Sequence, residues 1–454
     1  MLELILRKIF CIGITGLVSL PLFAFEFEDV RPEDAGFSSE KLSQIQKRFD
    51  ALYENGRIPN YAIGLYSGKQ RFYSGYRGRT EIDVGLPVNL DTIYQFASMT
   101  KPIVSTGIMI LIKDGKLSLN SKLSEFYPEF ESMFVAPGGS FETTFEEANR
   151  EITVKDLLTH TSGFTYQTSV TGQGDVAKQY DTTRVFFERE VTPIDQHIET
   201  LSQIPLVAHP GETFTYSVST DVLAGIIGKI TGMRLEEYLH EQIFNPLGMT
   251  NSSFYVKPEK TKNFAEFYMP LQATASAREA MDKKFNLPKS DGKPENEIDW
   301  KITKGSMFGS TVRTSPPSFD SGGGGLYASV NDYAKYCAMI LNGGEIDGVR
   351  ILDEETLNLH LSDLTPQLTS ENFRKDFGDG ATFMKFGGGY GIKYAADPGP
   401  GVPVDYYFWG GAFNTFFWID PTNGHLGVFA TNHSPPQYNI SDDIEQIVDE
   451  ARIR

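Results

Sequence analysis

The chain has 454 residues, of which 40% are apolar, 22% charged and 13% aromatic, and this composition excludes a disordered or fibrous protein. A chain of this length predicts a globular protein of two or three folding units. The 41 basic and 59 acidic residues give a net charge of −18, which repels the phosphate backbone of nucleic acids and anionic lipid surfaces. We therefore expect no nucleic-acid partner.

The N-terminal segment has the pattern of an export signal. Arg7 and Lys8 precede an uncharged, mostly apolar run from Ile9 to Ala24, and an acidic stretch follows directly. The run is short for a membrane span, so residues 1–24 are predicted to be a signal peptide cut after Ala24. An uncleaved anchor is the alternative. After cleavage we expect no membrane span and a location in the periplasm or outside the cell.

Cleavage would also leave a single cysteine in the chain. Cys11 lies in the predicted signal, and Cys337 lies in the apolar stripe of a helical pattern. An internal disulfide is therefore not expected. The expected state of Cys337 is a buried, unreactive thiol.

The first predicted element after the signal is an amphipathic helix. Ser38 or Ser39 can cap its start, and Asn55 followed by Gly56 ends it. Its apolar face consists of Leu42, Ile45, Phe49 and Leu52.

Strands are predicted near both ends of the chain. The runs 61–66 and 71–76 are rich in aromatic and β-branched residues and predict a hairpin. Near the C-terminus, 406–419 and 427–431 flank a turn at 420–424 and predict two further strands. Helical periodicity marks 154–158, 221–230, 332–341 and 441–454. This order predicts an α/β layer completed by both ends of the chain, with a helical insertion between them.

The strongest chemical signal is Ser98, which precedes Lys101 by about one helical turn. Pro102 would clash with the carbonyl four residues earlier, so the apolar helix over 103–112 must begin at or just after Ser98. A serine at a helix N-terminus has unpaired backbone N–H groups and the positive end of the dipole beside it, which suits an oxyanion. Lys101 lies on the same helix face, where a buried amine could accept the hydroxyl proton.

The Ser-x-x-Lys spacing alone is a weak signal. It also occurs at Ser38 and Ser290, where the surroundings indicate a helix cap and a polar turn. Because only Ser98 opens an apolar helix, we predict that Ser98 is a nucleophile. A helix-capping serine beside a surface lysine is the alternative.

Further motifs follow Ser98 in a specific order. They read FASMTKPIVSTGIMILIKDGKLSL, ITVKDLLTHTSGF, PGETFTYSVSTDVLAGIIGKITG, IFNPLGMTNSSFY, SGGGGLYASVNDYAKYCAMILNGG and FWGGAFNTFFWIDP. Over about residues 30–440 the chain resembles the class C β-lactamase-related serine hydrolases, and within that group it is most similar to the family VIII carboxylesterases.

The resemblance implies an α/β (α+β) fold with an antiparallel sheet flanked by N- and C-terminal helices, plus a mostly helical second domain. Residues 25–100 and 370–454 are expected to form the sheet domain, and 101–369 the helical domain. The active site would lie between the two domains. Two irregular insertions, about 129–150 and 257–318, are candidate walls of a substrate entrance.

The family's second motif is Tyr-x-Asn, whose tyrosine serves as general base or acid. The resemblance places it at Tyr216-Ser217-Val218, where the asparagine is missing. A phenol needs a cationic neighbour such as Lys101 to act as a base near pH 7. The alternative for Tyr216 is a core aromatic with a bonded hydroxyl.

The family's third motif is Lys-Thr-Gly in β-lactamases and corresponds here to Trp409-Gly410-Gly411, a form seen in the related esterases. Two glycines in a strand let a substrate approach the backbone closely. The next N–H group, from Ala412, would be the second oxyanion donor beside that of Ser98.

Two literal matches to these motifs are assigned other roles. Tyr53-Glu54-Asn55 lies before Ser98 at a helix end and indicates a turn. Lys385-Phe386-Gly387 indicates the entry to a glycine-rich strand.

Several other polar or glycine-rich features receive structural interpretations. Ser219 and Asp221 are expected to cap the helix that starts there, and His160 is expected to be structural. The glycines at 322–325 are expected to allow close packing before a helix capped by Ser329. The seven histidines show no metal-ligand spacing, so we expect neither a metal nor a cofactor.

The change from lysine to Trp409 removes the cation that would pair with the carboxylate of a β-lactam or peptide. We therefore predict an exported serine hydrolase that forms an acyl-enzyme, and most specifically a carboxylesterase acting on small neutral acyl esters. Ser98 would attack the carbonyl while Lys101 and Tyr216 move its proton. The alternatives are a β-lactamase or D-alanyl-D-alanine carboxypeptidase and, given the missing asparagine, a non-catalytic penicillin-binding or sensor protein.

Overall fold

The computed structural model describes residues 25–186, 191–270, 302–304, 312–377, 382–399, 401–434 and 440–453. The predicted signal peptide and most of the predicted insertion 257–318 lie outside the described residues. Within the described residues, no helix combines the length and the apolar composition that crossing a membrane requires.

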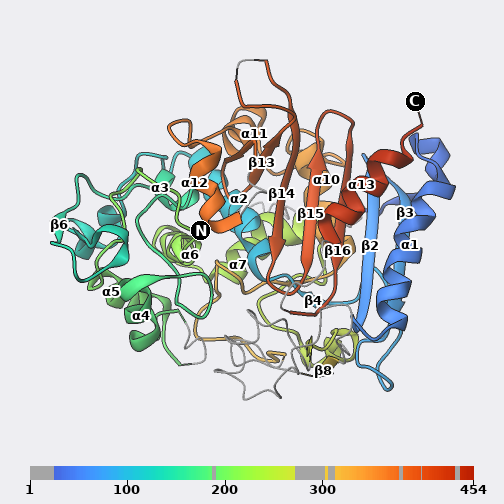
Figure 1. Cartoon of the computed structure of the whole chain (residues 1–454), viewed down its shortest axis with the longest axis horizontal. Coiled ribbons are helices and arrows are strands. Elements are labelled where there is room, and N and C mark those ends of the chain that lie inside the picture. The colour runs from blue at the N-terminus through green and yellow to red at the C-terminus, as the bar shows by residue number, and fades with distance from the viewer. Residues whose placement is uncertain are drawn as a thin grey trace, which may run out of the picture.

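An eight-stranded sheet joins the two ends of the chain (Figure 1). Its order is β1-β3-β2-β16-β15-β14-β13-β12, and every neighbouring pair is antiparallel except β1 and β3. The strands are β1 (Glu28–Asp29), β2 (Asn60–Ser67), β3 (Gln70–Gly78), β12 (Met384–Phe386), β13 (Gly391–Tyr394), β14 (Val404–Gly411), β15 (Thr415–Asp420) and β16 (His425–Ala430). Because β2 pairs with β16, the predicted α/β layer completed by both ends of the chain is confirmed.

Helices α1 (Ser39–Glu54) and α13 (Ile440–Ala451) cover one face of this sheet (Figure 1). The Ser38 hydroxyl accepts a hydrogen bond from the Lys41 N–H and caps α1, as predicted. The apolar side chains of α1 pack with those of α13 and with alternate residues of β2. Their members include Leu42, Ile45, Phe49, Leu52, Tyr61, Ile63, Leu65 and Ile444.

The opposite face of the sheet packs against the larger core. Helix α10 (Val330–Leu341) lies against β16 and β2, and the Ser329 hydroxyl caps it as predicted. Cys337 on this helix is fully buried, and burial raises the pKa of its thiol. The thiol is therefore protonated and unreactive near neutral pH.

The remaining helices form the part of the molecule that lies beside the sheet (Figure 1). They are α2 (Thr100–Lys113), α3 (Val154–Leu158), α4 (Gly174–Thr183), α5 (Ile194–Ser202), α6 (Ser219–Thr231), α7 (Leu235–Leu239), α8 (Asn245–Leu247), α11 (Glu354–Leu361) and α12 (Ser370–Phe377). Together with the antiparallel sheet they confirm the predicted α/β (α+β) fold class. Four short two-stranded ribbons accompany them: β4 (Tyr94–Gln95) with β9 (Tyr327–Ala328), β5 (Phe134–Val135) with β6 (Glu146–Glu147), β7 (Tyr268–Pro270) with β8 (Ile302–Lys304), and β10 (Glu345–Ile346) with β11 (Val349–Arg350).

One strand prediction was wrong. The run 406–419 is not a single strand but the hairpin of β14 and β15, with Gly411 paired to Thr415 across a turn at 412–414. Asn414 adopts a left-handed conformation with φ of 59°, which asparagine tolerates better than most residues. The turn residues 412–414 include no glycine or proline. The sequence pattern therefore predicts one strand that includes them together with the aromatic residues on both sides.

Candidate active site

Ser98 lies where the sheet meets the buried helix α2. A short 3₁₀ turn over Ala97–Met99 leads directly into α2, so the helical segment starts next to Ser98 as predicted. Ala97 has a φ of 44°, in the left-handed region that non-glycine residues seldom occupy. The Thr100 hydroxyl donates to the Ala97 carbonyl at 2.6 Å and stabilises this turn.

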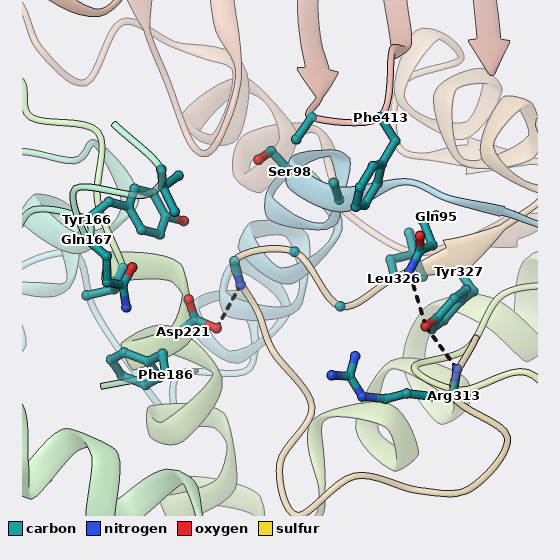
Figure 2. Close-up of a pocket in the computed structure, with 17 residues that line it drawn as sticks. Gln95, Ser98, Tyr166, Gln167, Phe186, Asp221, Arg313, Leu326, Tyr327 and Phe413 are labelled. Atoms are coloured by element: carbon teal, nitrogen blue, oxygen red, sulfur yellow. Dashed lines mark hydrogen bonds between the residues drawn. The ribbon is translucent and has the colours of Figure 1, made fainter. Parts of the chain in front are cut away.

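A cavity of about 900 Å³, including its part open to solvent, adjoins Ser98 (Figure 2). The hydroxyls of Ser98 and Tyr166 both point into the cavity, from opposite sides. Apolar side chains from several loops complete the walls: Val170, Phe186, Val218, Leu326 and Phe413.

Lys101 is fully buried one turn after Ser98. Its ammonium donates a 2.6 Å hydrogen bond to the carbonyl of Gly323. The Nζ atom also lies 4.6 Å from the ring centroid of Tyr216 and 5.5 Å from that of Tyr166. Both phenol rings therefore lie beside the buried cation.

Tyr216 lies in the loop before α6 and packs against the predicted third motif. Its ring centroid is 5.7 Å from that of Trp409 and 4.9 Å from that of His160. The structure thus brings Ser98, Lys101, Tyr216 and Trp409 into one region of the fold, although they come from three distant segments of the sequence.

His160 supports the loop that carries Tyr216. Its Nδ1 accepts a 3.3 Å hydrogen bond from the backbone N–H of Ser217. Burial, and secondarily the nearby charge of Lys101, lower the pKa of His160 well below its usual value. The imidazole is therefore neutral near pH 7, which agrees with the structural role predicted for it.

The turn between β14 and β15 brings the third motif beside the serine. A Cβ atom on Gly411 would collide with the Phe96 carbonyl oxygen and with the Thr415 hydroxyl. Only glycine permits this approach of β14 to the segment that carries Ser98. Ala412 follows directly and lines the cavity together with Ser98.

The two glycines of the third motif differ in what they contact. A Cβ atom on Gly410 would meet only the Thr415 carbonyl, at an ordinary 3.5 Å. The steric requirement for glycine therefore falls on Gly411 and not on Gly410.

The literal motif matches have other roles, as predicted, although Phe386 of the second match packs against Trp409 with ring centroids 5.2 Å apart. Asn55 ends α1 on the outer face of the sheet. Lys385 lies in β12, where its ammonium donates to the carbonyls of Thr365 and Leu368 and pairs with Asp363.

The capping prediction for Ser219 and Asp221 was wrong. Val218 is the N-cap of α6, and no side chain caps that helix. The Ser219 hydroxyl bonds the hydroxyls of Ser162 and Ser217, and the Asp221 carboxylate bonds the segment at 321–323. Local sequence reasoning assigns an Asp at a helix start to a cap because it cannot include a partner 100 residues away.

Sequence reasoning also missed Tyr166 and Gly323. Tyr166 lines the cavity six residues after His160, so its place in the motif that begins HTSGF was the available signal. The glycine run at 322–325 packs closely as predicted, since a Cβ atom on Gly322 would collide with the Thr220 carbonyl. The bond between Gly323 and Lys101 had no signal in the sequence.

No group of three or more potential metal ligands occurs among the residues that the structure describes. The site consists of a hydroxyl at a helix start, a buried ammonium, two phenols and a glycine-containing strand end. Such a set can activate a serine for attack on a carbonyl group.

Comparison with known proteins agrees with this chemistry. A family model described as Beta-lactamase matches residues 45–450. Protein Rv1367c of Mycobacterium tuberculosis (strain ATCC 25618 / H37Rv) is 31% identical over 369 residues, which are 80% of this chain and 82% of that protein. Esterase EstB of Burkholderia gladioli is 25% identical over 422 residues, covering 88% of this chain and 93% of that protein.

The fold comparison agrees as well. A crystal structure described as a family VIII carboxylesterase superposes with a TM-score of 0.61 at 16% identity, covering 92% of this chain and 99% of that chain. The predicted resemblance is therefore confirmed. Because the family model covers most of the sequence and the fold agrees with it, the chain belongs to the Beta-lactamase family and is a serine hydrolase.

Proposed function

We propose that the protein is an exported carboxylesterase that works through an acyl-enzyme on Ser98. The observation that carries this proposal is the placement of the Lys101 ammonium, fully buried one turn from Ser98 and 4.6 Å from the Tyr216 ring. A serine at a cavity, followed one helical turn later by a buried lysine that lies beside a phenol ring, supports removal of the serine proton by this pair.

In the proposed reaction, the pair of Lys101 and Tyr216 lacks one proton, and Ser98 Oγ attacks the ester carbonyl carbon while its single proton passes to the deprotonated member of that pair. The carbon–oxygen bond to the alcohol then breaks, and the leaving oxygen receives that proton. Water attacks the resulting acyl-enzyme, losing a proton to the same groups, and Ser98 Oγ leaves with a proton restored. In total, one ester and one water give one carboxylic acid and one alcohol, and this scheme uses no metal or cofactor.

The backbone N–H groups of Ser98 and Ala412 are the proposed oxyanion donors. Both residues line the cavity, and the close approach at Gly411 holds their two segments together. Each such donor typically contributes on the order of 10²-fold or more to turnover.

Trp409 supports an ester as the substrate in preference to a β-lactam. Its buried indole stands where β-lactamases carry a lysine, so a substrate carboxylate would lack that partner. We expect kcat/KM for a p-nitrophenyl butyrate ester to exceed that for nitrocefin on the order of 10²-fold. Parallel assays with Ser98→Ala on both substrates control for contaminating enzymes.

A strong preference for nitrocefin would contradict this role of Trp409. Arg313 also lines the cavity, beside Tyr327 (Figure 2). Such a result would point to Arg313 as the group that binds the substrate carboxylate.

Intact-mass spectrometry separates the esterase from the two alternatives. The esterase should show a transient acyl adduct with short esters and little adduct with a penicillin. A D-alanyl-D-alanine carboxypeptidase, the activity named for a Salmonella agona (strain SL483) relative that is 25% identical over 75% of this chain, should release D-alanine from a peptide ending in D-alanyl-D-alanine. A stable penicillin adduct without ester turnover would indicate a sensor.

Export is part of the proposal and rests on the sequence of residues 1–24. Phe25 is buried, and Glu26 pairs with the buried Lys335 at 3.0 Å, so the fold uses the residues directly after the expected cleavage point. N-terminal sequencing of protein recovered from the periplasm or medium should begin at Phe25. A product that keeps residues 1–24 would contradict cleavage.

A further inference from the structure

The ammonium of Lys101 is held by a backbone carbonyl from a distant part of the chain. The Tyr-x-Asn motif of the family has Val218 in place of asparagine, and a valine side chain offers no polar atom. Lys101 Nζ donates to the Gly323 carbonyl at 2.6 Å. The position of that carbonyl therefore controls the position of the amine.

A single carboxylate oxygen fixes the segment that presents this carbonyl. Asp221 Oδ1 accepts a hydrogen bond from the Ser321 hydroxyl at 2.7 Å. It accepts a second one from the Gly323 N–H at 3.1 Å (Figure 2). Asp221 is 3% exposed and Ser321 is 2% exposed. Charged, buried hydrogen bonds of this kind are stronger than neutral ones and restrict the geometry more tightly.

Close packing also restricts the backbone of the segment at 321–323. A Cβ atom on Gly322 would collide with the Thr220 carbonyl, and one on Gly323 would collide with Asp221 Oδ2 and lie 3.1 Å from the Tyr166 hydroxyl. The segment therefore lies directly on the start of α6. Tyr166, whose hydroxyl faces Ser98 across the cavity, lies next to the same Gly323.

We propose that Asp221 is a positioning residue for the serine hydrolase reaction, holding the Gly323 carbonyl where it orients the Lys101 ammonium toward Ser98 and the phenols. This inference rests on the role of Lys101 in the proposed function.

The proposal distinguishes two substitutions at the same position. Asparagine can still accept both hydrogen bonds through its side-chain oxygen, whereas alanine accepts neither and leaves the buried Gly323 N–H without that partner. Loss of alignment by about 1 Å can lower a rate on the order of 10²-fold.

The test measures the rate constant of acylation by a fluorophosphonate probe and kcat/KM for a p-nitrophenyl ester, with the melting temperature as a record of folding. Asp221→Ala is expected to lower both rate constants on the order of 10²-fold. Asp221→Asn should restore them to within about tenfold of the wild type, since it keeps the acceptor.

Asp332 supplies a matched control. It also lies in the first turn of a helix, is 2% exposed, and accepts a backbone N–H from Asn251 at 2.6 Å and the Ser252 hydroxyl at 2.9 Å. Asp332→Ala should lower the melting temperature while the acylation rate of the folded protein stays within about twofold, because these bonds do not reach Lys101.

Should Asp221→Ala fail to fold, Ser321→Ala removes one of the two bonds without a charge change and is expected to slow acylation about tenfold. Wild-type rates in folded Asp221→Ala, or in Ser321→Ala when Asp221→Ala does not fold, would overturn the inference. Equal losses in folded Asp221→Ala and Asp221→Asn would also overturn it. A wild-type protein that neither reacts with the probe nor cleaves the ester would instead contradict the proposed function.

Discussion

Ser98→Ala is expected to lower kcat/KM for p-nitrophenyl esters by at least about 10⁴-fold, because removal of a nucleophile abolishes the acyl-enzyme route. The remaining rate would come from oxyanion stabilisation and substrate binding alone. The variant should also fail to gain mass after exposure to a fluorophosphonate. Ser98 is partly exposed at the cavity, so loss of its hydroxyl should leave the melting temperature nearly unchanged.

Ser38→Ala is the matched control for this prediction. Ser38 has the same spacing to Lys41, but its hydroxyl caps α1 on the outer face of the sheet. This substitution should cost about 1 kcal/mol of stability and leave ester hydrolysis unchanged. Ester hydrolysis by Ser98→Ala at the wild-type rate would remove Ser98 from the mechanism.

Lys101→Met is expected to slow fluorophosphonate acylation about 10³-fold, since a positioned acid–base group typically contributes 10² to 10⁴. Methionine fills a similar volume but can neither carry the transferred proton nor donate to the Gly323 carbonyl. Its uncharged side chain also removes the cation beside the rings of Tyr216 and Tyr166. The rate should be measured by stopped-flow labelling on protein whose circular dichroism matches that of the wild type.

Lys335→Met tests whether loss of any buried lysine has this effect. Lys335 is also buried, and its ammonium donates to the Gly248 carbonyl at 3.1 Å and to Glu26 at 3.0 Å. Acylation should be unaffected in this variant. If Lys101→Met and Lys335→Met both acylate within tenfold of the wild type, Lys101 is not the proton carrier.

The Tyr216 ring packs against both the Lys101 ammonium and the Trp409 indole. If the proposed roles of these residues hold, a substitution of Trp409 would shift the Tyr216 ring. We therefore expect substitutions of Trp409 to alter turnover as well as substrate preference.

The sequence by itself determined the features that depend on neighbouring residues. The cap at Ser38, the cap at Ser329 and the start of the buried helix beside Ser98 follow from local hydrogen bonding and from the ring of Pro102. The order of motifs was sufficient to predict the fold class and the serine hydrolase family. These signals depend on neighbouring residues or on the order of motifs along the chain, so they can be recognised in the sequence.

Only the tertiary structure decided which partners the buried polar groups find. Asp221 bonds a segment 100 residues later, Lys101 donates to a carbonyl 222 residues away, and Gly411 approaches the Phe96 carbonyl. Such contacts leave no periodicity in the chain, because a buried donor or acceptor must be satisfied by whichever group the packing brings near. The turn at 412–414 was missed because Gly410 and Gly411 were interpreted as residues inside a longer strand, and only the pairing of β14 with β15 shows that the strand ends there.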